Sequence, residues 1–207
     1  MKTKEFTFKS ATGVCDIYGC RYTPDDDAVK AVIAINHGMA EHQARYRDFV
    51  SFLTSNGFAV YMHDMANHGK SNNDKNLTGY FGKKDGYKAL VKDFDSVVKI
   101  AKTDYPDKKL VIMGHSMGSF IVRCYTAWYP NAGFDGAIYM GTGGSNPIAG
   151  VGDFVSSLIA KVTGYKKKVA LLDKMTFGSY NNKFEKRTAF DLSLIHISEP
   201  TRLQLIS

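Results

Sequence analysis

The sequence is poor in cysteine and has no long hydrophobic run. Only three cysteines occur in 207 residues, and their spacing fits neither a disulfide framework nor a metal site. This usage favours a reducing compartment, so we expect a cytoplasmic protein. No apolar stretch approaches the roughly 20 residues that a membrane-spanning helix needs. The first residues, MKTKEFTFKSATG, lack the apolar core of a signal peptide and read as a strand.

A concentrated basic surface is also missing, although the formal net charge is +7. The lysines occur as singles and pairs, apart from the run Lys166–Lys168. No aromatic and basic platform suited to nucleic acid is present, so we expect no nucleic-acid partner. A solvated surface is the favoured interpretation, and transient contact with an anionic membrane surface stays open as the alternative.

Strand and helix patterns alternate along the chain after an N-terminal hairpin over Lys4–Ser10 and Val14–Tyr22. Further strands are predicted at Ala31–Asn36, Phe58–Asp64, Lys109–Gly114 and Gly136–Gly141, and helices at Tyr46–Ser55, Tyr87–Ala101 and Met117–Tyr129. The run AVIAIN is apolar throughout, as in a strand buried on both faces. This order predicts an α/β fold with a doubly wound, mostly parallel sheet.

The stretch LVIMGHSMGSF places a serine between a strand and a helix. Gly114, His115, Ser116, Met117 and Gly118 fit the pattern G-x-S-x-G. In such a turn the serine adopts a strained backbone conformation, and side chains at the glycine positions would collide with the neighbouring strand and helix. The pattern alone is weak, but its position at a strand-to-helix corner is the one that a nucleophile needs. We therefore predict that Ser116 is a catalytic nucleophile and not an ordinary surface serine.

Acyl transfer also needs an oxyanion hole, usually made of two backbone N–H groups. One is expected from Met117, at the N-terminus of the helix that follows the serine. The other is expected from Met39, in the loop HGMAEH after the AVIAIN strand, with Gly38 allowing close approach of the backbone.

The histidines of this region are interpreted as loop residues. The ring of His37 is expected to brace the loop by hydrogen bonds and not to serve as the catalytic base. His42 and His68 are expected in loops, and Glu41 and His42 have no third ligand at useful spacing, so no metal site is predicted.

Three segments together resemble a known family: INHGMAEHQARYRDFVSFLTSNGFAVYMHD, NHGKS and MGHSMGSF. They are similar to the monoacylglycerol lipase and lysophospholipase branch of the α/β-hydrolases, which is also described as serine aminopeptidase-like. The resemblance runs from about Val14 to Asp191 and implies an α/β-hydrolase fold without metal or organic cofactor. One departure is Asn67, where many relatives carry glycine.

The resemblance also implies two segments of hydrolase chain. Residues 1–142 would form the N-terminal part of the hydrolase core, and residues 143–191 the start of a helical lid. In the lid, Phe154 and Leu158 belong to an apolar stripe that would line an acyl-binding tunnel. An ordinary core-packing helix explains the same stripe, so both interpretations stay open.

The last residues, 192–207, do not read as hydrolase sequence. LSLIHISEPTR is the translation of a transposase adapter used in preparing sequencing libraries, so we expect a non-native tail. In this fold the nucleophile is followed by the acid and then the histidine, and the only histidine after Ser116 is His196, in that tail. We therefore expect the sheet to lack its last strands, and the catalytic acid and base to be missing from this chain.

The expected activity of the parent enzyme is hydrolysis of carboxylic esters of single-acyl lipids through an acyl-enzyme on Ser116, with the truncated chain nearly inactive. Another hydrolase activity, such as that of a thioesterase or an aminopeptidase, is the main alternative. A non-catalytic binding protein is a further one.

Overall fold

A computed structural model describes residues 1–72, 74, 77, 79–82 and 85–144. They belong to one compact unit, Met1–Asn146. Residues 145–191 of the expected lid, with Phe154 and Leu158, and the expected non-native tail lie outside the described residues.

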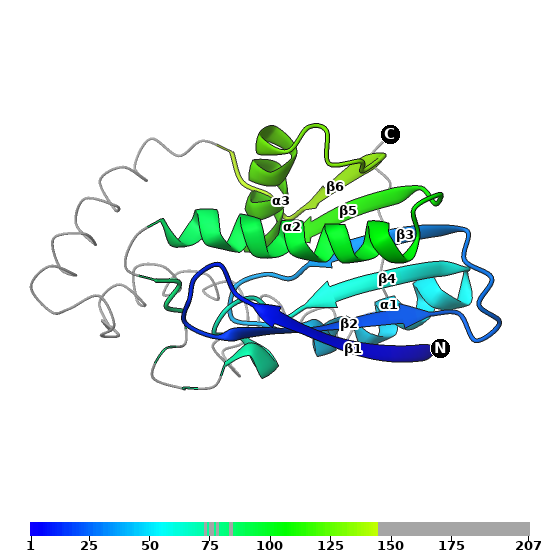
Figure 1. Cartoon of the computed structure of the whole chain (residues 1–207), viewed down its shortest axis with the longest axis horizontal. Helices are drawn as coiled ribbons and strands as arrows, with labels where there is room; N and C mark the ends of the chain where they lie inside the picture. The colour runs from blue at the N-terminus through cyan, green and yellow to red at the C-terminus, as the bar shows by residue number, and fades with distance from the viewer. Residues whose placement is uncertain (73, 75–76, 78, 83–84, 145–207) are drawn as a thin grey trace, which may run out of the picture. The chain divides into compact units, whose positions relative to one another are not determined.

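Six strands form one sheet in the spatial order β1-β2-β4-β3-β5-β6 (Figure 1). The strands are β1 (Lys2–Lys9), β2 (Asp16–Thr23), β3 (Ala31–Asn36), β4 (Phe58–His63), β5 (Leu110–His115) and β6 (Gly136–Met140). The hairpin β1–β2 pairs antiparallel, and β2 pairs antiparallel with β4. All pairs among β3, β4, β5 and β6 are parallel.

Helices cover both faces of this sheet. The covering helices are α1 (Arg47–Ser55), α2 (Gly86–Asp104) and α3 (Met117–Trp128). Two short 3₁₀ turns, η1 (Gln43–Tyr46) and η2 (Gly69–Ser71), lie in the loops. In Figure 1, α2 and α3 lie in front of the sheet and α1 lies behind it. The predicted α/β fold with a mostly parallel sheet is therefore confirmed.

The AVIAIN strand, β3, supplies side chains to both layers. Ile33 and Ile35 pack with α1, while Val32 and Ala34 pack in the larger core with α2 and α3. Successive side chains of a strand point to opposite faces, so an apolar run without alternation is what a doubly covered strand requires.

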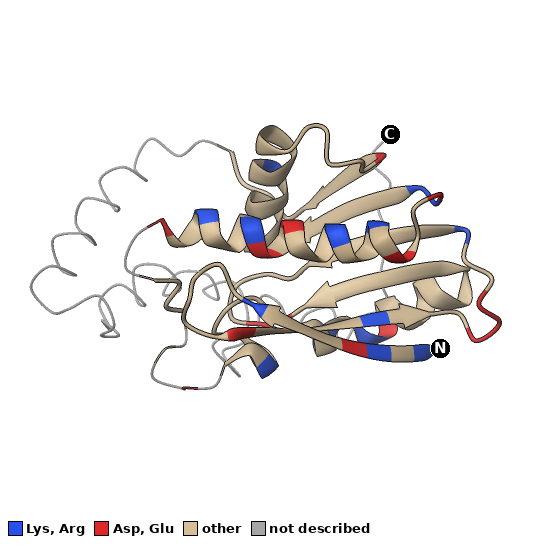
Figure 2. Cartoon of the chain, in the orientation of Figure 1, with Lys and Arg blue, Asp and Glu red and all other residues tan. Residues whose placement is uncertain are grey.

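Helix α2 buries its apolar stripe as the helical spacing predicts. The buried members are Leu90, Val91, Phe94, Val97, Val98 and Ala101. Tyr87, which the sequence pattern includes in this stripe, is 54% exposed in the first turn and lies beside Trp128 of α3. On the outer face of α2, basic and acidic residues are interspersed (Figure 2).

The chain reverses its direction of travel across the sheet beside β3. It moves from β3 to β4 on one side, and then crosses to β5 on the other. In register, Asn36 at the end of β3 pairs with Gly114 near the end of β5. Ligands of open α/β sheets bind outside the carboxyl ends of strands at such a switch point, which places a site at the loops that begin with His37 and Ser116.

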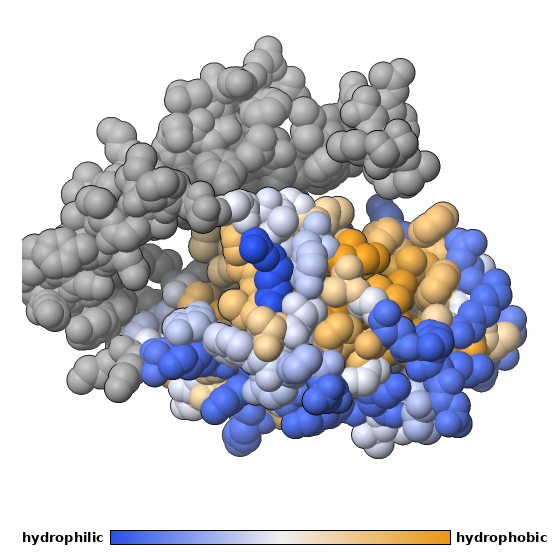
Figure 3. All heavy atoms as spheres, turned by 90° about the horizontal axis from the view of Figure 1, so that it is seen from above, coloured by the Kyte–Doolittle hydropathy of each residue, from blue (hydrophilic) through white to orange (hydrophobic). Residues whose placement is uncertain are grey.

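Strand β6 is the last strand of the described sheet, and its apolar side chains are exposed. Ile138, Tyr139 and Met140 are between 41% and 47% exposed. Figure 3 views the molecule from the top of Figure 1, where β6 and α3 lie, and shows a hydrophobic area bordered by polar residues.

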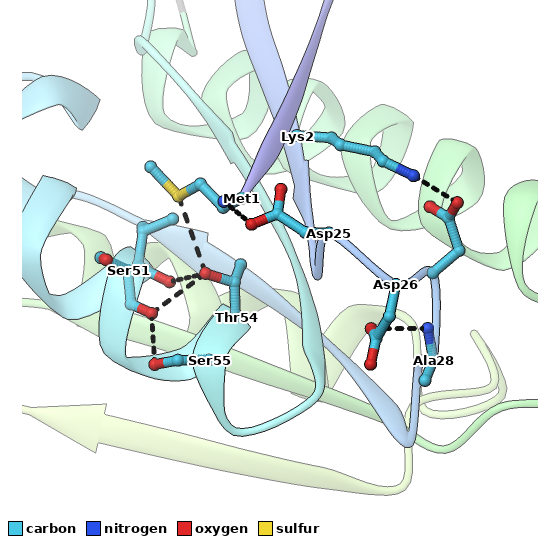
Figure 4. A network of polar contacts seen from close by, with 10 residues as sticks. Met1, Lys2, Asp25, Asp26, Ala28, Ser51, Thr54 and Ser55 are labelled. Atoms are coloured by element: carbon cyan, nitrogen blue, oxygen red, sulfur yellow. Dashed lines mark hydrogen bonds and ion pairs between the residues drawn. The ribbon is translucent and has the colours of Figure 1, made fainter.

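Met1, the residue before β1, contacts α1 near the opposite edge of the sheet (Figure 4). The hydroxyl of Thr54 donates to the carbonyl oxygen of Val50 at 3.0 Å and approaches the sulfur of Met1 at 3.7 Å. Lys2 forms an ion pair with Asp27. These contacts lie at the β1–β2 edge of the sheet, away from β5.

Candidate active site

Ser116 occupies a sharp corner between β5 and α3. Its backbone angles are φ 51° and ψ −119°, a region that residues with a β-carbon rarely adopt. The corner is held from both sides, because the Ser116 amide donates to Met140 O at 2.9 Å and the Ser119 hydroxyl donates to Ser116 O at 2.6 Å. The sheet and the helix thus hold the serine, which remains partly exposed, in a strained conformation.

The two flanking glycines leave no room for a side chain. A β-carbon at Gly114 would lie 2.3 Å from the carbonyl oxygen of Gly118. A β-carbon at Gly118 would lie 2.3 Å from Asn36 O and 2.4 Å from His37 O. The spacing G-x-S-x-G therefore reflects contact of the first helical turn with β5 and with the end of β3.

The two predicted oxyanion donors lie on either side of this corner. Met117 is the first residue of α3, and the first N–H groups of a helix have no partner within the helix. Met39 lies in the loop after β3 and is 43% exposed. Gly38, which precedes it, is close to the serine, since a β-carbon added there would lie 3.2 Å from Ser116 Cβ. The donor positions therefore border the serine, as a two-amide oxyanion hole requires.

The buried ring of His37 holds the peptide between Gly38 and Met39. The Met65 amide donates to Nε2 at 2.9 Å, so the proton must be on Nδ1, which donates to Gly38 O at 2.7 Å. Burial lowers the pKa of His37 to about 4, so the ring is neutral near pH 7. Because N–H and C=O of a trans peptide point in opposite directions, this bond also sets the direction of the Met39 amide.

Glu41 joins the loop after β3 to the serine corner. Its Oε1 atom accepts from the Gly38 amide at 2.5 Å, from the Tyr46 hydroxyl at 2.8 Å and from His115 Nδ1 at 3.0 Å. Burial acts to raise its pKa, but the hydrogen bonds from His115, Tyr46 and Gly38 outweigh it and bring the pKa of Glu41 to about 2. Sequence reasoning weighed Glu41 only as a metal ligand and missed this contact.

A second buried polar group lies at the ends of β3 and β4. The side-chain polar atoms of Asn36 and both ring nitrogens of His63 are buried without a hydrogen-bond partner in the described structure. His68 Nδ1 donates to Ala66 O at 3.0 Å, and the His68 ring stacks on Phe81. Burial lowers the pKa of His63 to about 3 and also lowers the pKa of His68. Nothing in the local sequence signals that His63 is fully buried.

Asn67 is in a left-handed conformation, with φ 57°. Glycine adopts this region without strain, and asparagine tolerates it better than most other residues. Its side-chain amide donates to the carbonyl oxygen of Tyr80. Asn67 therefore occupies a conformation that glycine would adopt without strain, and its side chain makes one hydrogen bond that glycine could not make.

Within the described residues, no hydrogen bond joins the Ser116 hydroxyl to a histidine, and both nitrogens of His37 are already engaged. The described residues also contain no group of three or more His, Cys, Asp or Glu side chains that could hold a metal ion. No helix in that part of the chain is long and apolar enough to cross a membrane.

A serine on a strained strand-to-helix corner, at the switch point of a mostly parallel sheet, defines the α/β-hydrolase class. A family model described as Hydrolase_4, serine aminopeptidase S33, matches residues 27–192, and the chain belongs to this family. The resemblance identified in the sequence is thereby confirmed.

Relatives of this chain include lipases and esterases. It is 32% identical to a monoacylglycerol lipase of Mycolicibacterium smegmatis over 80% of the chain and 54% of that protein. It is 28% identical to the monoglyceride lipase of Mus musculus over 87% of the chain and 55% of that protein. The chain thus spans about half the length of these relatives.

Solved structures agree on the fold. A thermostable carboxyl esterase from Bacillus coagulans, in complex with glycerol, superposes with a TM-score of 0.80 at 28% identity, covering 97% of this chain and 66% of that one. A lipase in an open form gives a TM-score of 0.74 at 24% identity, covering 89% and 59%.

Proposed function

We propose that this chain is part of a serine hydrolase that cleaves carboxylic esters of single-acyl lipids, of the monoacylglycerol or lysophospholipid type. The observation that carries the proposal is the strained Ser116 corner with the Gly38–Met39 peptide beside its β-carbon. The names of the relatives, monoacylglycerol lipase and carboxyl esterase, support the choice of ester and acyl chain.

In the proposed reaction the Ser116 hydroxyl attacks the ester carbonyl as a base removes its proton. The carbonyl oxygen becomes negatively charged and accepts hydrogen bonds from the Met39 and Met117 amides. Each donor of this kind contributes roughly a hundredfold to a thousandfold in rate. The alcohol then leaves, and water hydrolyses the acyl-enzyme to regenerate the serine.

The base and its acid partner are proposed to lie outside these 207 residues, because the family order places them after further strands. Among the described histidines, those at positions 37, 63 and 68 are buried and His115 is engaged with Glu41 through Nδ1, which supports this placement. With only Ser116 and the oxyanion donors, the chain would retain roughly 10³–10⁴ over water. Residues 192–207 are proposed to be the non-native tail predicted from the sequence.

The test compares this chain with a completed enzyme, in which residues 1–191 are joined to the C-terminal part of the M. smegmatis lipase. Hydrolysis is measured on a monoacylglycerol, a lysophospholipid, an acyl thioester and an aminoacyl anilide. We expect the completed enzyme to prefer the two esters and to lose that activity in Ser116→Ala. Equal turnover by the 207-residue chain would overturn the proposal about the missing base.

The same panel decides between the alternatives. The family description as serine aminopeptidase makes the anilide a genuine competitor, and a thioester preference would indicate a thioesterase. A binding function that survives Ser116→Ala, with no hydrolysis of any substrate, would indicate a non-catalytic protein.

A further inference from the structure

The carboxylate of Glu41 lies between the two loops of the candidate site, and its side chain is only 7% exposed. Three donors converge on Oε1, and the guanidinium of Arg45 lies 3.3 Å from Oε2. A buried charge loses several kcal/mol of hydration. Such a group is retained where its hydrogen bonds fix a geometry, as the contacts of Glu41 do here.

Two of the three donors belong to different halves of the site. Gly38 precedes the Met39 oxyanion donor, while His115 precedes the nucleophile, and Glu41 is 74 residues away from His115 in sequence. The same oxygen therefore holds both loops at once. The pairing of β3 with β5 ends at Asn36 and Gly114. The contacts of Glu41 with Gly38 and His115 lie just beyond that end.

The space around Gly38 shows how closely the parts fit. A β-carbon placed there would lie 2.7 Å from Glu41 Oε1, 3.2 Å from His115 Nδ1 and 3.2 Å from Ser116 Cβ. Loss of the carboxylate would leave a gap on one side of Gly38 and would free its amide. The loop after β3 could then move away from the serine by about 1 Å.

We propose that Glu41 is a positioning residue that fixes the distance between the Met39 oxyanion donor and the Ser116 nucleophile. The inference rests on the proposed hydrolase function and assigns a role to a residue that does not touch the substrate. Displacement of a catalytic group by about 1 Å can reduce the rate a hundredfold. The expected defect is therefore in kcat, with substrate binding largely kept.

The low pKa of Glu41 supports this role. At about pKa 2 the group is ionised across the working range of a hydrolase, so all three donors keep a charged acceptor. Glu41→Gln retains one oxygen that can accept from Gly38 but places an amide NH₂ near Arg45. Glu41→Gln should therefore retain more ester hydrolysis than Glu41→Ala, which keeps no acceptor for these donors.

Asp93 offers a matched control, because it is another buried carboxylate that holds a distant loop. It accepts from the Ser10 hydroxyl at 2.6 Å and from the Ala11 amide at 2.7 Å, and it contacts neither Gly38 nor the serine corner. Asp93→Ala should lower the melting temperature about as much as Glu41→Ala. Its kcat per active site should stay within about threefold of the parent.

The experiment measures kcat and KM for ester hydrolysis in the completed enzyme, with active sites counted by a fluorophosphonate. We expect Glu41→Ala to lower kcat about 30- to 100-fold with KM within about threefold, and Glu41→Gln to recover to within about tenfold of the parent. A kcat for Glu41→Ala within threefold of the parent would overturn the inference. Equal losses in Asp93→Ala would also overturn it, because they would show a general effect of stability.

A second readout does not depend on activity. Amide hydrogen exchange at Gly38, followed by NMR in the 207-residue chain, should accelerate at least about tenfold in Glu41→Ala and stay unchanged in Asp93→Ala. Unchanged exchange at Gly38 in Glu41→Ala would refute the link itself. Hydrolysis that persists without Ser116 would instead refute the proposed function, whatever the Glu41 variants do.

Discussion

The Nδ1 atom of His37 lies 2.7 Å from the carbonyl oxygen of Gly38, and this bond sets the orientation of the peptide that carries the Met39 amide. The ring can make this bond only with Nδ1 protonated and Nε2 accepting from Met65. A second proton on Nε2 would face the Met65 N–H group directly. The geometry of the loop after β3, which carries the proposed Met39 oxyanion donor, therefore depends on a neutral histidine.

Folding stability should accordingly fall in mildly acidic solution. His37, His63 and His68 all have a lowered pKa in the folded state, mainly because of burial. The unfolded chain binds protons near pH 6.5 while the folded chain does not, so stability is fully present above pH 6.5 and is lost as pH falls toward 4. The loss is up to about 1.4 kcal/mol per pH unit for each histidine.

Thermal melting between pH 7.5 and 4.5 checks this prediction. The Glu41 carboxyl contributes a separate loss below pH 4.5, because its pKa is lowered to about 2. Burial raises the pKa of Asp93, so that group opposes the trend at low pH. His63→Gln should reduce the slope between pH 6.5 and 4.5, and a melting temperature independent of pH in this window would contradict the assignment.

The backbone conformation of Ser116 should lower the stability of the folded protein. At φ 51° and ψ −119° a residue with a β-carbon is strained by about 1–3 kcal/mol. Ser116→Gly relieves this strain but adds flexibility to the unfolded chain, for a net gain of about 1 kcal/mol over Ser116→Ala. The difference is measured by denaturant unfolding, and an alanine variant as stable as the glycine variant would argue against strain.

Gly118→Ala should destabilise the protein even though it lies in the first turn of a helix. Alanine normally stabilises a helix interior by about 1 kcal/mol relative to glycine. Here its methyl group would meet backbone oxygens of Asn36 and His37 at 2.3–2.4 Å. We expect a net loss of about 3 kcal/mol in unfolding free energy.

Gly136→Ala is the control for that variant, since a β-carbon at Gly136 has only Val111 Cγ2 nearby, at 3.9 Å. Its unfolding free energy should stay within about 1 kcal/mol of the parent. If both glycines tolerate alanine equally, the close contact between α3 and the end of β3 is not present in solution.

Asn67 should tolerate glycine better than alanine. Glycine adopts the observed φ of 57° freely, whereas alanine is strained there, and both substitutions lose the hydrogen bond to Tyr80. Asn67→Ala should therefore melt below Asn67→Gly by an amount equivalent to about 1 kcal/mol. The reverse order in differential scanning calorimetry would contradict the left-handed assignment.

Most of the secondary structure follows from local patterns. The AVIAIN strand, Ala31–Asn36, has the predicted bounds, and the helix after Ser116 begins at Met117 as predicted. The strand predicted at Phe58–Asp64 ends one residue earlier. The Asp64 carboxylate instead accepts from the Gln43 and Lys70 amides in the loops. The local sequence pattern shows where apolar residues recur. It does not show which carboxylate will accept hydrogen bonds from the backbone amides of a loop.

The long-range arrangement could not be predicted in the same way. The position of β4 between β2 and β3 depends on strand pairing across the sheet, for which the sequence carries no local signal. The contact of Glu41 with His115 arises only when the ends of β3 and β5 meet. The spacing of Gly114 and Gly118, by contrast, indicates close backbone contact within a short stretch of sequence. The Ser116 corner could therefore be predicted from the sequence.

The role of Ser116 as the acyl-accepting nucleophile is tested most directly by mapping a covalent adduct. The completed enzyme is treated with a fluorophosphonate, digested, and analysed by tandem mass spectrometry, with Ser116→Ala beside it. The account predicts a single phosphonylated residue, Ser116, and ester hydrolysis that disappears with the label in Ser116→Ala. An adduct on another residue, or hydrolysis undiminished in Ser116→Ala, would contradict it.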